Sequence, residues 1–241
     1  MASDIPAPTP APTMEQAQPS LEIAVLLFEG MTASDAITPY EVLRWLPGAV
    51  VKFVAETPGP KRMDSGFLTL TADYALEDVP HPDVLVVPPP PLGSPSYANE
   101  RLLAWLRAAH ETTQWTVSLC AGPLLLGAAG LLNGVRATAN IFIVNQLAQF
   151  GAIPAYGEQY VRDGKIVTAS DYPAGIAMAL RLTALIAGEE TARAMQLLAN
   201  YDPHTPYDYA ALRADPATMA RAQVLLDGFF AAAAARRAAP V

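Results

Sequence analysis

The feature that most constrains the fold is a set of short segments that are apolar at almost every position. Leu21–Phe28 is the first, and Ala49–Ala55 and Asp83–Val87 follow the same pattern. A strand with one face in water alternates between apolar and polar residues, whereas a continuously apolar strand is buried on both faces. A helical pattern separates the first two segments; Ser34 and Asp35 precede it, it passes through Tyr40 and Leu46, and it ends at Pro47-Gly48. The chain is therefore predicted to form an α/β fold whose mostly parallel sheet carries helices on both faces.

The rest of the chain continues this alternation of strands and helices. Gln114–Cys120 is predicted to be a strand that runs directly into an apolar helix from Gly122 to Leu132. The other expected elements are a hairpin over Thr57–Leu70, a helix over Asn99–His110, a short strand over Arg136–Ala139, a helix over Ile141–Phe150, a hairpin of Glu158–Val161 and Lys165–Ala169, helices over Pro173–Ala187 and Glu189–Asn200, a loop over Tyr201–Asp208 and a helix from Pro216 to about Arg237.

The length and composition predict one domain with a disordered N-terminal tail. A chain of 241 residues with 52% hydrophobic content can bury one sizeable core, so we expect a single α/β domain over residues 21–241, with a C-terminal helical extension. Residues 1–20 are rich in Pro and Ala and bury too little apolar area to offset the entropy of ordering. We expect them to be disordered.

Charge and cysteine content exclude several classes of function. The 15 Lys and Arg against 23 Asp and Glu give a net charge of −8 without a basic cluster, so nucleic acid is not an expected partner. No run of about 18 apolar residues predicts a membrane span. One cysteine forms no internal disulfide and no secretory signal is present, so we expect a cytoplasmic protein. His81, His110 and His204 lack the spacing of a metal site, and no metal or cofactor is expected.

The single cysteine, Cys120, stands at the junction between the predicted strand and the apolar helix. Unpaired N–H groups at the start of a helix favour a thiolate, which predicts a lowered cysteine pKa and a nucleophile. Gly122 permits a tight turn and Pro123 suits the first helical turn, so the segment resembles a nucleophile elbow with cysteine in place of serine. The alternative interpretation is a buried cysteine that serves only as a small hydrophobic side chain.

Three other features lie where a ligand site is expected. The run Pro88–Pro91 follows a buried strand, at the end of the strand where open α/β sheets hold their ligands. Asp35 and Asp171 each precede a predicted helix, so each carboxylate has an alternative role as a helix cap. If the two carboxyl groups lie close together, Asp171 is a second acid whose pKa responds to Asp35.

Several separated motifs occur in the order and spacing of one family. They are Leu26-Leu27-Phe28, Asp35 with Pro39–Leu43, Glu56–Pro60, Asp64-Ser65-Gly66, Ser118–Gly122, Leu126–Leu132, Arg136–Thr138, Val161–Gly164, Ala174-Gly175 and Tyr201–Pro203. Together they resemble the PfpI-like, class I glutamine amidotransferase-like superfamily, and within it the isonitrile hydratase branch. The resemblance implies a flavodoxin-like sheet, a homodimer, a small-molecule substrate, Cys120 as nucleophile and Asp35 as the nearby acid. It also implies a lyase that adds water to an isocyanide and releases an N-substituted formamide.

The departures from this branch all surround the expected site. Prolines at residues 88–90 replace a Pro-Gly-Gly sequence, and Ala121 replaces a threonine after the nucleophile. Because proline has no backbone N–H, Pro89 and Pro90 cannot stabilise a developing negative charge, whereas the N–H of Ala121 remains. The new polar groups at positions that face the site in the family are Asn140, Asp171 and Tyr172. We expect these three, with Ala121, Pro89 and Pro90, to contact the substrate.

The sequence is compatible with three functions. The first is isonitrile hydration by Cys120 and Asp35. The second is a diverged cysteine-dependent reaction on another small electrophile, such as a secondary metabolite, and the third is non-catalytic binding of a small molecule in a regulatory role. Retention of the thiol and the carboxylate favours an enzyme with altered chemistry or substrate. No basic helix-turn-helix region follows residue 209, which argues against a fused transcription activator.

Overall fold

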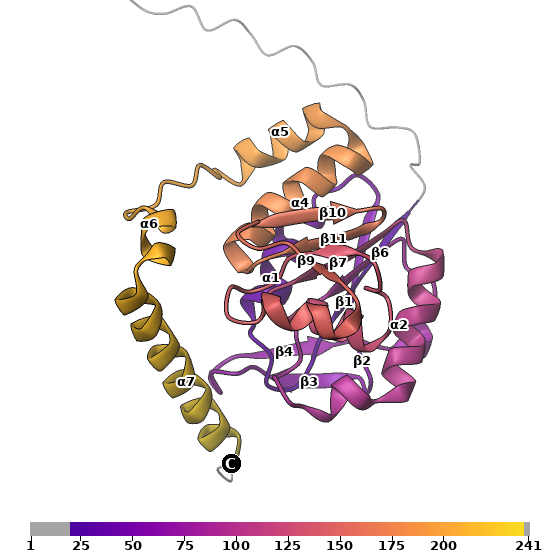
Figure 1. Cartoon of the computed structure of the whole chain (residues 1–241). Coiled ribbons are helices and arrows are strands. Elements are labelled where there is room, and N and C mark those ends of the chain that lie inside the picture. The colour runs from indigo at the N-terminus through magenta and orange to yellow at the C-terminus, as the bar shows by residue number, and fades with distance from the viewer. Residues whose placement is uncertain (1–19, 239–241) are drawn as a thin grey trace, which may run out of the picture.

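The computed structural model describes residues 20–238, so the predicted disorder of residues 1–20 falls almost entirely outside the described part of the chain. Within this range a sheet has the strand order β10-β11-β7-β6-β1-β2-β5 (Figure 1). The strands are β1 Leu21–Leu26, β2 Ala49–Ala55, β5 Tyr74–Ala75, β6 Val84–Val87, β7 Trp115–Leu119, β10 Tyr160–Asp163 and β11 Ile166–Ala169. Every pair is parallel except β10 with β11. The predicted mostly parallel α/β sheet is confirmed.

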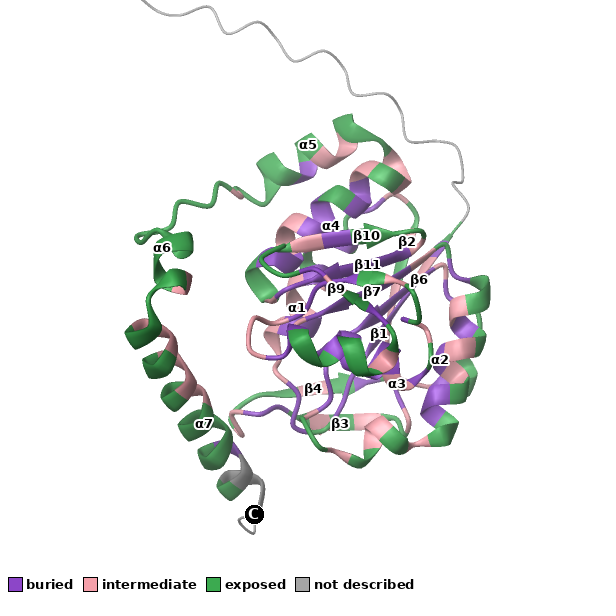
Figure 2. Cartoon of the chain, in the orientation of Figure 1, coloured by how far each residue is buried: buried purple, intermediate pink, exposed green. Residues whose placement is uncertain are grey.

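Helices cover both faces of this sheet. The crossover from β1 to β2 passes through α1 (Ser34–Leu43), and the crossover from β6 to β7 runs in the opposite direction through α2 (Glu100–Thr112). Because such crossovers are right-handed, α1 and α2 lie on opposite faces. α4 (Tyr172–Ala187) packs against α1, and α3 (Gly122–Ala128) packs against α2. The strands between the two layers are largely buried, as Figure 2 shows, and every residue of β6 and β11 is buried.

The strand order fixes where a ligand site can form. The chain moves from β1 to β2 on one side of β1 and then places β6 on the other side. The crevice at such a reversal, beyond the carboxyl ends of the strands, is the usual ligand site of open parallel sheets. The segments Gly30–Thr32, Pro88–Pro91 and Cys120 follow β1, β6 and β7 and meet at this edge.

The smaller elements lie outside the main sheet. β3 (Gly59–Arg62) and β4 (Thr69–Ala72) form the expected antiparallel hairpin. β8 (Arg136–Ala137) and β9 (Ile153–Pro154) form a second small pair. Short 3-10 helices occur at η1 (Leu76–Asp78) and η2 (Pro95–Ala98). None of the helices described for this chain is both long and apolar enough to cross a membrane.

Two local interpretations of the sequence do not hold. The alternative role of Asp35 as the cap of α1 fails, because the helix begins at Ser34 and no side chain caps it. The helix predicted over Ile141–Phe150 is a turn followed by a 3-10 helix, η3 (Val144–Phe150). The reason lies at Asn140, whose carbonyl accepts the N–H groups of both Ile143 and Val144 at 2.9 Å, so that the segment starts as a tight turn.

The C-terminal part forms an arm beside the core of the molecule. α5 (Glu189–Leu198) is followed by an extended stretch and then by α6 (Tyr209–Ala214) and α7 (Pro216–Ala238), as Figure 1 shows. The sequence did not predict α6, which has six residues. The Asp208 carboxylate caps it by accepting the N–H of Ala210 at 2.9 Å. Asp215 caps α7 in the same way, through the N–H groups of Ala217 and Thr218 at 3.2 and 3.1 Å.

Gly122→Ala tests the close packing of α3 against the end of β6. A Cβ at residue 122 would lie 2.3 Å from the carbonyl oxygen of Val87 and 2.5 Å from Oγ of Ser118. We expect the substitution to lower the free energy of unfolding by about 3 kcal/mol, measured by urea denaturation. Gly228→Ala in α7 is the matched control, because nothing lies within 4 Å of a Cβ there. A Gly122→Ala variant as stable as the wild type would contradict this packing.

Candidate active site

Cys120 sits in a strained turn that is held from both sides. Its φ of 57° lies in the left-handed region, which residues other than glycine rarely adopt. The Cys120 N–H donates to the carbonyl of Ala169 at 3.0 Å, and the Cys120 carbonyl accepts the N–H of Asn140 at 3.0 Å. These bonds join the end of β7 to the end of β11 and to the segment before η3. The turn presents a partly buried thiol at the carboxyl edge of the sheet, in the arrangement of a nucleophile elbow.

The carboxyl group of Asp35, in the first turn of α1, lies close enough to the thiol of Cys120 for each group to shift the pKa of the other. Only 1% of Asp35 is exposed, and its Oδ2 has no hydrogen-bond partner in the described chain. Burial raises the pKa of Asp35 to about 7, the nearby Cys120 thiol lowers it, and the charges of Asp171 and Asp64 raise it further. The carboxyl group therefore titrates near neutral pH, which suits a group that takes up and releases a proton.

The sequence-based prediction of a lowered thiol pKa was wrong. Burial raises the pKa of Cys120 well above its ordinary value, and the neighbouring Asp35 carboxylate raises it further. The backbone N–H of Ala121 bonds to the sulfur and lowers the pKa, but this effect is smaller. α3 is only seven residues long, and its positive end is outweighed by desolvation and by the nearby carboxylate. The raised pKa keeps the thiol of Cys120 protonated at neutral pH.

The pocket in front of Cys120 is small and mostly apolar. Its volume is about 80 Å³, whereas pockets for drug-sized ligands have volumes of roughly 300–1,000 Å³. The lining residues are Gly30, Met31, Thr32, Pro89, Pro90, Pro91, Leu92, Cys120, Ala121, Asn140, Phe142, Ile143, Leu226 and Phe230. Asp35 is not among these lining residues. The dimensions and lining fit a small molecule with an apolar substituent.

The proline run forms one wall of this pocket and supplies no N–H donor. Pro89 and Pro90 are both buried and line the pocket. Oγ of Ser118 donates to the carbonyl of Val87 at 2.7 Å, which fixes the start of the run against β7. The Tyr97 hydroxyl donates to the carbonyl of Pro90 at 3.3 Å. Burial and the nearby Cys120 charge raise the pKa of Tyr97, so its hydroxyl stays protonated.

Two polar groups remain beside the thiol as donors. The N–H of Ala121 bonds to the sulfur of Cys120. The side-chain oxygen of Asn140 accepts the N–H of Phe142 at 3.1 Å, which leaves the amide NH₂ as the end of Asn140 that can donate to a ligand. Both residues line the pocket. An anion that develops near Cys120 thus has one backbone donor and one side-chain donor within the pocket wall.

The structure separates the other two expected contacts from this pocket. Asp171 caps α4 by accepting the N–H of Ala174 at 2.9 Å, and its other oxygen accepts Oγ of Ser170 at 3.0 Å. Its charge reaches the site, because it raises the pKa values of Asp35 and Cys120. Tyr172 is 51% exposed and is not among the pocket residues. Asp171 therefore acts on the site at a distance, and Tyr172 remains a prediction without a contact to the pocket.

Sequence reasoning missed the apolar part of the lining. Met31, Phe142 and Ile143 come from segments next to recognised motifs, so proximity to those motifs was the available signal. Leu226 and Phe230 come from α7, about a hundred residues after Cys120, and no local pattern connects them to the site. Asp64 is buried beside the site and accepts the hydroxyl of Thr32 at 2.6 Å. It lies in a matching motif, but its effect on Asp35 is visible only in three dimensions.

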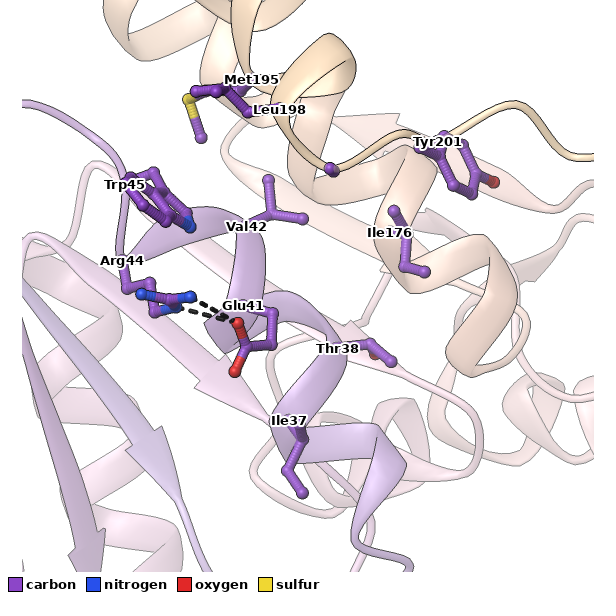
Figure 3. A pocket seen from close by; sticks show the side chains of 11 residues that line it. Ile37, Thr38, Glu41, Val42, Arg44, Trp45, Ile176, Met195, Leu198 and Tyr201 are labelled. Carbon is purple, nitrogen blue, oxygen red and sulfur yellow. Dashed lines mark hydrogen bonds and ion pairs between the residues drawn. The ribbon is translucent and has the colours of Figure 1, made fainter.

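A larger groove lies between α1, α4 and α5, away from the thiol. Its volume is about 480 Å³, and Figure 3 shows its mainly apolar lining with the Glu41–Arg44 ion pair at one side. Neither Cys120 nor Asp35 contributes to it. In the described part of the chain no group of three or more His, Cys, Asp or Glu residues could hold a metal ion. The chemistry that the described residues can perform is therefore concentrated at Cys120 and Asp35.

Comparison with known proteins places this arrangement in a family. Residues 21–185 match the model of the DJ-1/PfpI family, and the match includes Asp35, Cys120 and the proline run. The chain belongs to the DJ-1/PfpI family. The superfamily predicted from the motifs is confirmed, and the family fold agrees with the flavodoxin-like sheet seen here.

Individual relatives differ in how far they match. Isonitrile hydratase of Pseudomonas putida is 36% identical over 189 residues, which cover 78% of this chain and 82% of that protein. A ThiJ/PfpI family protein of Pseudomonas syringae has a TM-score of 0.81 and 29% identity over 98% of this chain and 99% of its own. DJ-1beta of Drosophila melanogaster has a TM-score of 0.67 and 21% identity, covers 76% of this chain and 100% of its own, and shows the fold alone.

Asp35→Asn tests whether this carboxyl group titrates as its burial requires. In the unfolded chain the pKa of Asp35 is near 3.8, and in the folded protein it is about 7. The folded state binds the Asp35 proton more tightly than the unfolded state does. The stability that this proton binding contributes is therefore fully present below pH 3.8 and is lost as the pH rises through 7. The difference between the two pKa values corresponds to about 4 kcal/mol.

We therefore expect the difference in the free energy of unfolding, Asp35→Asn minus wild type, to be larger at pH 8 than at pH 4, by up to about 4 kcal/mol. The variant thus becomes more stable relative to the wild type as the pH rises. Urea denaturation at the two pH values measures it. Asp73→Asn, which removes an exposed carboxylate, is the control. Equal differences at both pH values for Asp35→Asn would show that the buried carboxyl group is ionised throughout.

Proposed function

We propose that the protein is a cysteine-dependent, hydratase-type lyase that adds water to a small isocyanide or to another small electrophile. The observation that carries the proposal is the pairing of the Cys120 thiol, at a small apolar pocket, with the nearby buried carboxyl group of Asp35. The 36% identity to isonitrile hydratase of Pseudomonas putida supports isocyanide hydration as the first reaction to test. The proposal includes a cytoplasmic homodimer that needs no cofactor.

The proposed reaction uses the thiol proton at each stage. Sγ of Cys120 attacks the terminal carbon of the isocyanide, while the Asp35 carboxylate takes the thiol proton and delivers it to that carbon. The product is a thioimidate in which the carbon carries one hydrogen and a bond to sulfur. Water then adds to the same carbon, the C–S bond breaks, and an N-substituted formamide leaves while Cys120 recovers its proton. One water is consumed and no oxidant or reductant is needed.

This chemistry agrees with the pKa order at the site. The thiol, whose pKa is raised, is mostly protonated at neutral pH, so attack requires a base next to it. The Asp35 carboxylate is that base, and its pKa of about 7 allows it both to accept and to return the proton near neutral pH. The small fraction of ionised Asp35 below pH 7 predicts a rate that rises with pH through that value.

The proline wall of the pocket lacks N–H donors that would stabilise negative charge in the transition state of this mechanism. A developing negative charge would meet the Ala121 N–H and the Asn140 amide, but no N–H from Pro89 or Pro90. Loss of one such donor typically costs about 3 kcal/mol of transition-state stabilisation. We therefore propose that isocyanide hydration by the wild type is weak. The same observation favours, as a second candidate, a non-catalytic binder of small apolar molecules.

The proposed homodimer has a candidate contact surface in the groove of Figure 3. Trp45 is 55% exposed there and Leu198 is 71% exposed, and both line the groove between α1, α4 and α5. Leu197 on α5 is 80% exposed. Exposed large apolar side chains of this kind are typical of a surface that is buried by association. A second copy that covers this face leaves the Cys120 pocket open.

A substrate panel separates the enzymatic candidate from the binder. Purified protein and the matched variant Cys120→Ser are incubated with a series of isocyanides and aldehydes, and formamide or other product is measured by chromatography. We expect low but detectable turnover of at least one compound by the wild type and none by Cys120→Ser. Tight binding without turnover by the wild type, unchanged in Cys120→Ser, would establish the binder instead.

Replacing Pro89 and Pro90 together by glycine tests the missing donor. Glycine restores the backbone N–H groups, so isocyanide hydration should rise by up to about 100-fold if the loop reaches the sulfur. Replacing Pro60, an exposed hairpin residue, by glycine is the control for a general effect of proline loss. Strong hydration by the wild type, not increased in the double variant, would show that the proline wall does not limit the reaction.

A further inference from the structure

The C-terminal helix α7 places one of its faces over the site. Leu226, Phe230 and Ala233 are spaced at i, i+4 and i+7, so they share one face of the helix. Leu226 and Phe230 line the Cys120 pocket; Leu226 is half-buried, Phe230 is 41% exposed and Ala233 is fully buried. The adjacent residues Val224 and Leu225 are 63% and 60% exposed. The helix therefore has an inner face toward the pocket and an outer face toward solvent.

The arm is also seated on the body of the protein through α6. Tyr209 and Arg213 lie against residues 138–144, 156–159 and 170, with which they line a shallow cavity. A Cβ at Gly157 would lie 3.1 Å from the Arg213 guanidinium, so the helix approaches that loop closely. Ser170, the residue before the α4 cap Asp171, lines the same cavity, so α6 lies next to the start of α4. With α6 anchored there, α7 runs past the mouth of the pocket.

We infer that α7 is the outer wall of the Cys120 pocket and that Leu226 and Phe230 determine how large a substituent the substrate can carry. The family match ends at residue 185, so this wall lies outside the region that the family model describes. Met31, Phe142 and Ile143 form the facing apolar wall. A substrate that reaches Sγ has to place its substituent between these two apolar walls. The preferred substituent is a compact apolar group without charge.

That the substrate is an isocyanide rests on the proposed function. That α7 forms a wall of the Cys120 pocket does not depend on that function. Cys120 is the only cysteine of the sequence, so alkylation reports on access to this pocket alone. Its rate can be measured by intact mass even if the protein hydrates nothing. The two probes are iodoacetamide and an N-naphthyl iodoacetamide, which share the reactive group and differ in the size of the apolar substituent.

The test compares the ratio of the two alkylation rates, naphthyl reagent over iodoacetamide, among variants of α7. The double variant Leu226→Ala/Phe230→Ala widens the pocket and should raise this ratio at least about tenfold. Leu225→Ala is the matched control, because it makes the same substitution on the exposed face of the same helix, and should leave the ratio within about twofold. Leu226→Trp narrows the pocket and should lower the ratio.

Three results would overturn the inference: an unchanged ratio in the double variant, an equal change in Leu225→Ala, or a Leu226→Trp variant that accepts the naphthyl reagent as well as the wild type does. Thermal unfolding of each variant confirms that it is folded. If hydration is detected, isocyanides of increasing size should follow the same order among the variants. If hydration is absent while the alkylation ratios change as expected, the wall is established and the proposed reaction fails.

Discussion

The interaction between the Cys120 thiol and the buried Asp35 carboxyl group is the one on which the account of this site depends. Neither group is in its ordinary environment. Asp35 is 1% exposed, and the Cys120 backbone is held at a φ of 57° by bonds to Ala169 and Asn140. The sheet order brings them together, because β1 leads into the helix that carries Asp35 and β7 ends at Cys120 on the same edge of the sheet. Burial raises the pKa values of both groups, so the thiol is protonated at neutral pH and the carboxyl group titrates near pH 7.

The surroundings of this pair define what it can act on. The proline run forms a wall without N–H donors, and the remaining donors are on Ala121 and Asn140. α7 contributes Leu226 and Phe230 to the pocket lining. The result is a small apolar chamber that contains one thiol and lies close to one buried carboxyl group. Such a chamber suits an uncharged electrophile with a compact substituent, and it suits a charged or highly hydrated substrate poorly, because desolvation of a charge in it is costly.

The sequence predicted correctly those elements whose structure depends on their own local residue pattern. The continuously apolar strands Leu21–Phe28 and Asp83–Val87 are central in the sheet, and the turn at Cys120 is where the strand-to-helix pattern placed it. The thiol pKa was predicted in the wrong direction, because helix position is local whereas desolvation and the Asp35 charge come from the tertiary fold. The role of α7 could not be predicted from the sequence either. The local pattern around Leu226 and Phe230 indicates only an Ala-rich helix, and their place at the pocket depends on the tertiary fold.

The most direct test is titration of the Cys120 thiol. Because the chain has one cysteine, the ultraviolet absorbance of its thiolate can be followed against pH in the wild type and in Asp35→Asn, with Cys120→Ser as the blank. The account predicts a wild-type thiol that ionises well above the ordinary cysteine range and an Asp35→Asn thiol that ionises at lower pH, since the carboxylate that opposes the thiolate is gone. A wild-type thiol already ionised at neutral pH, or one whose titration is unchanged in Asp35→Asn, would contradict it.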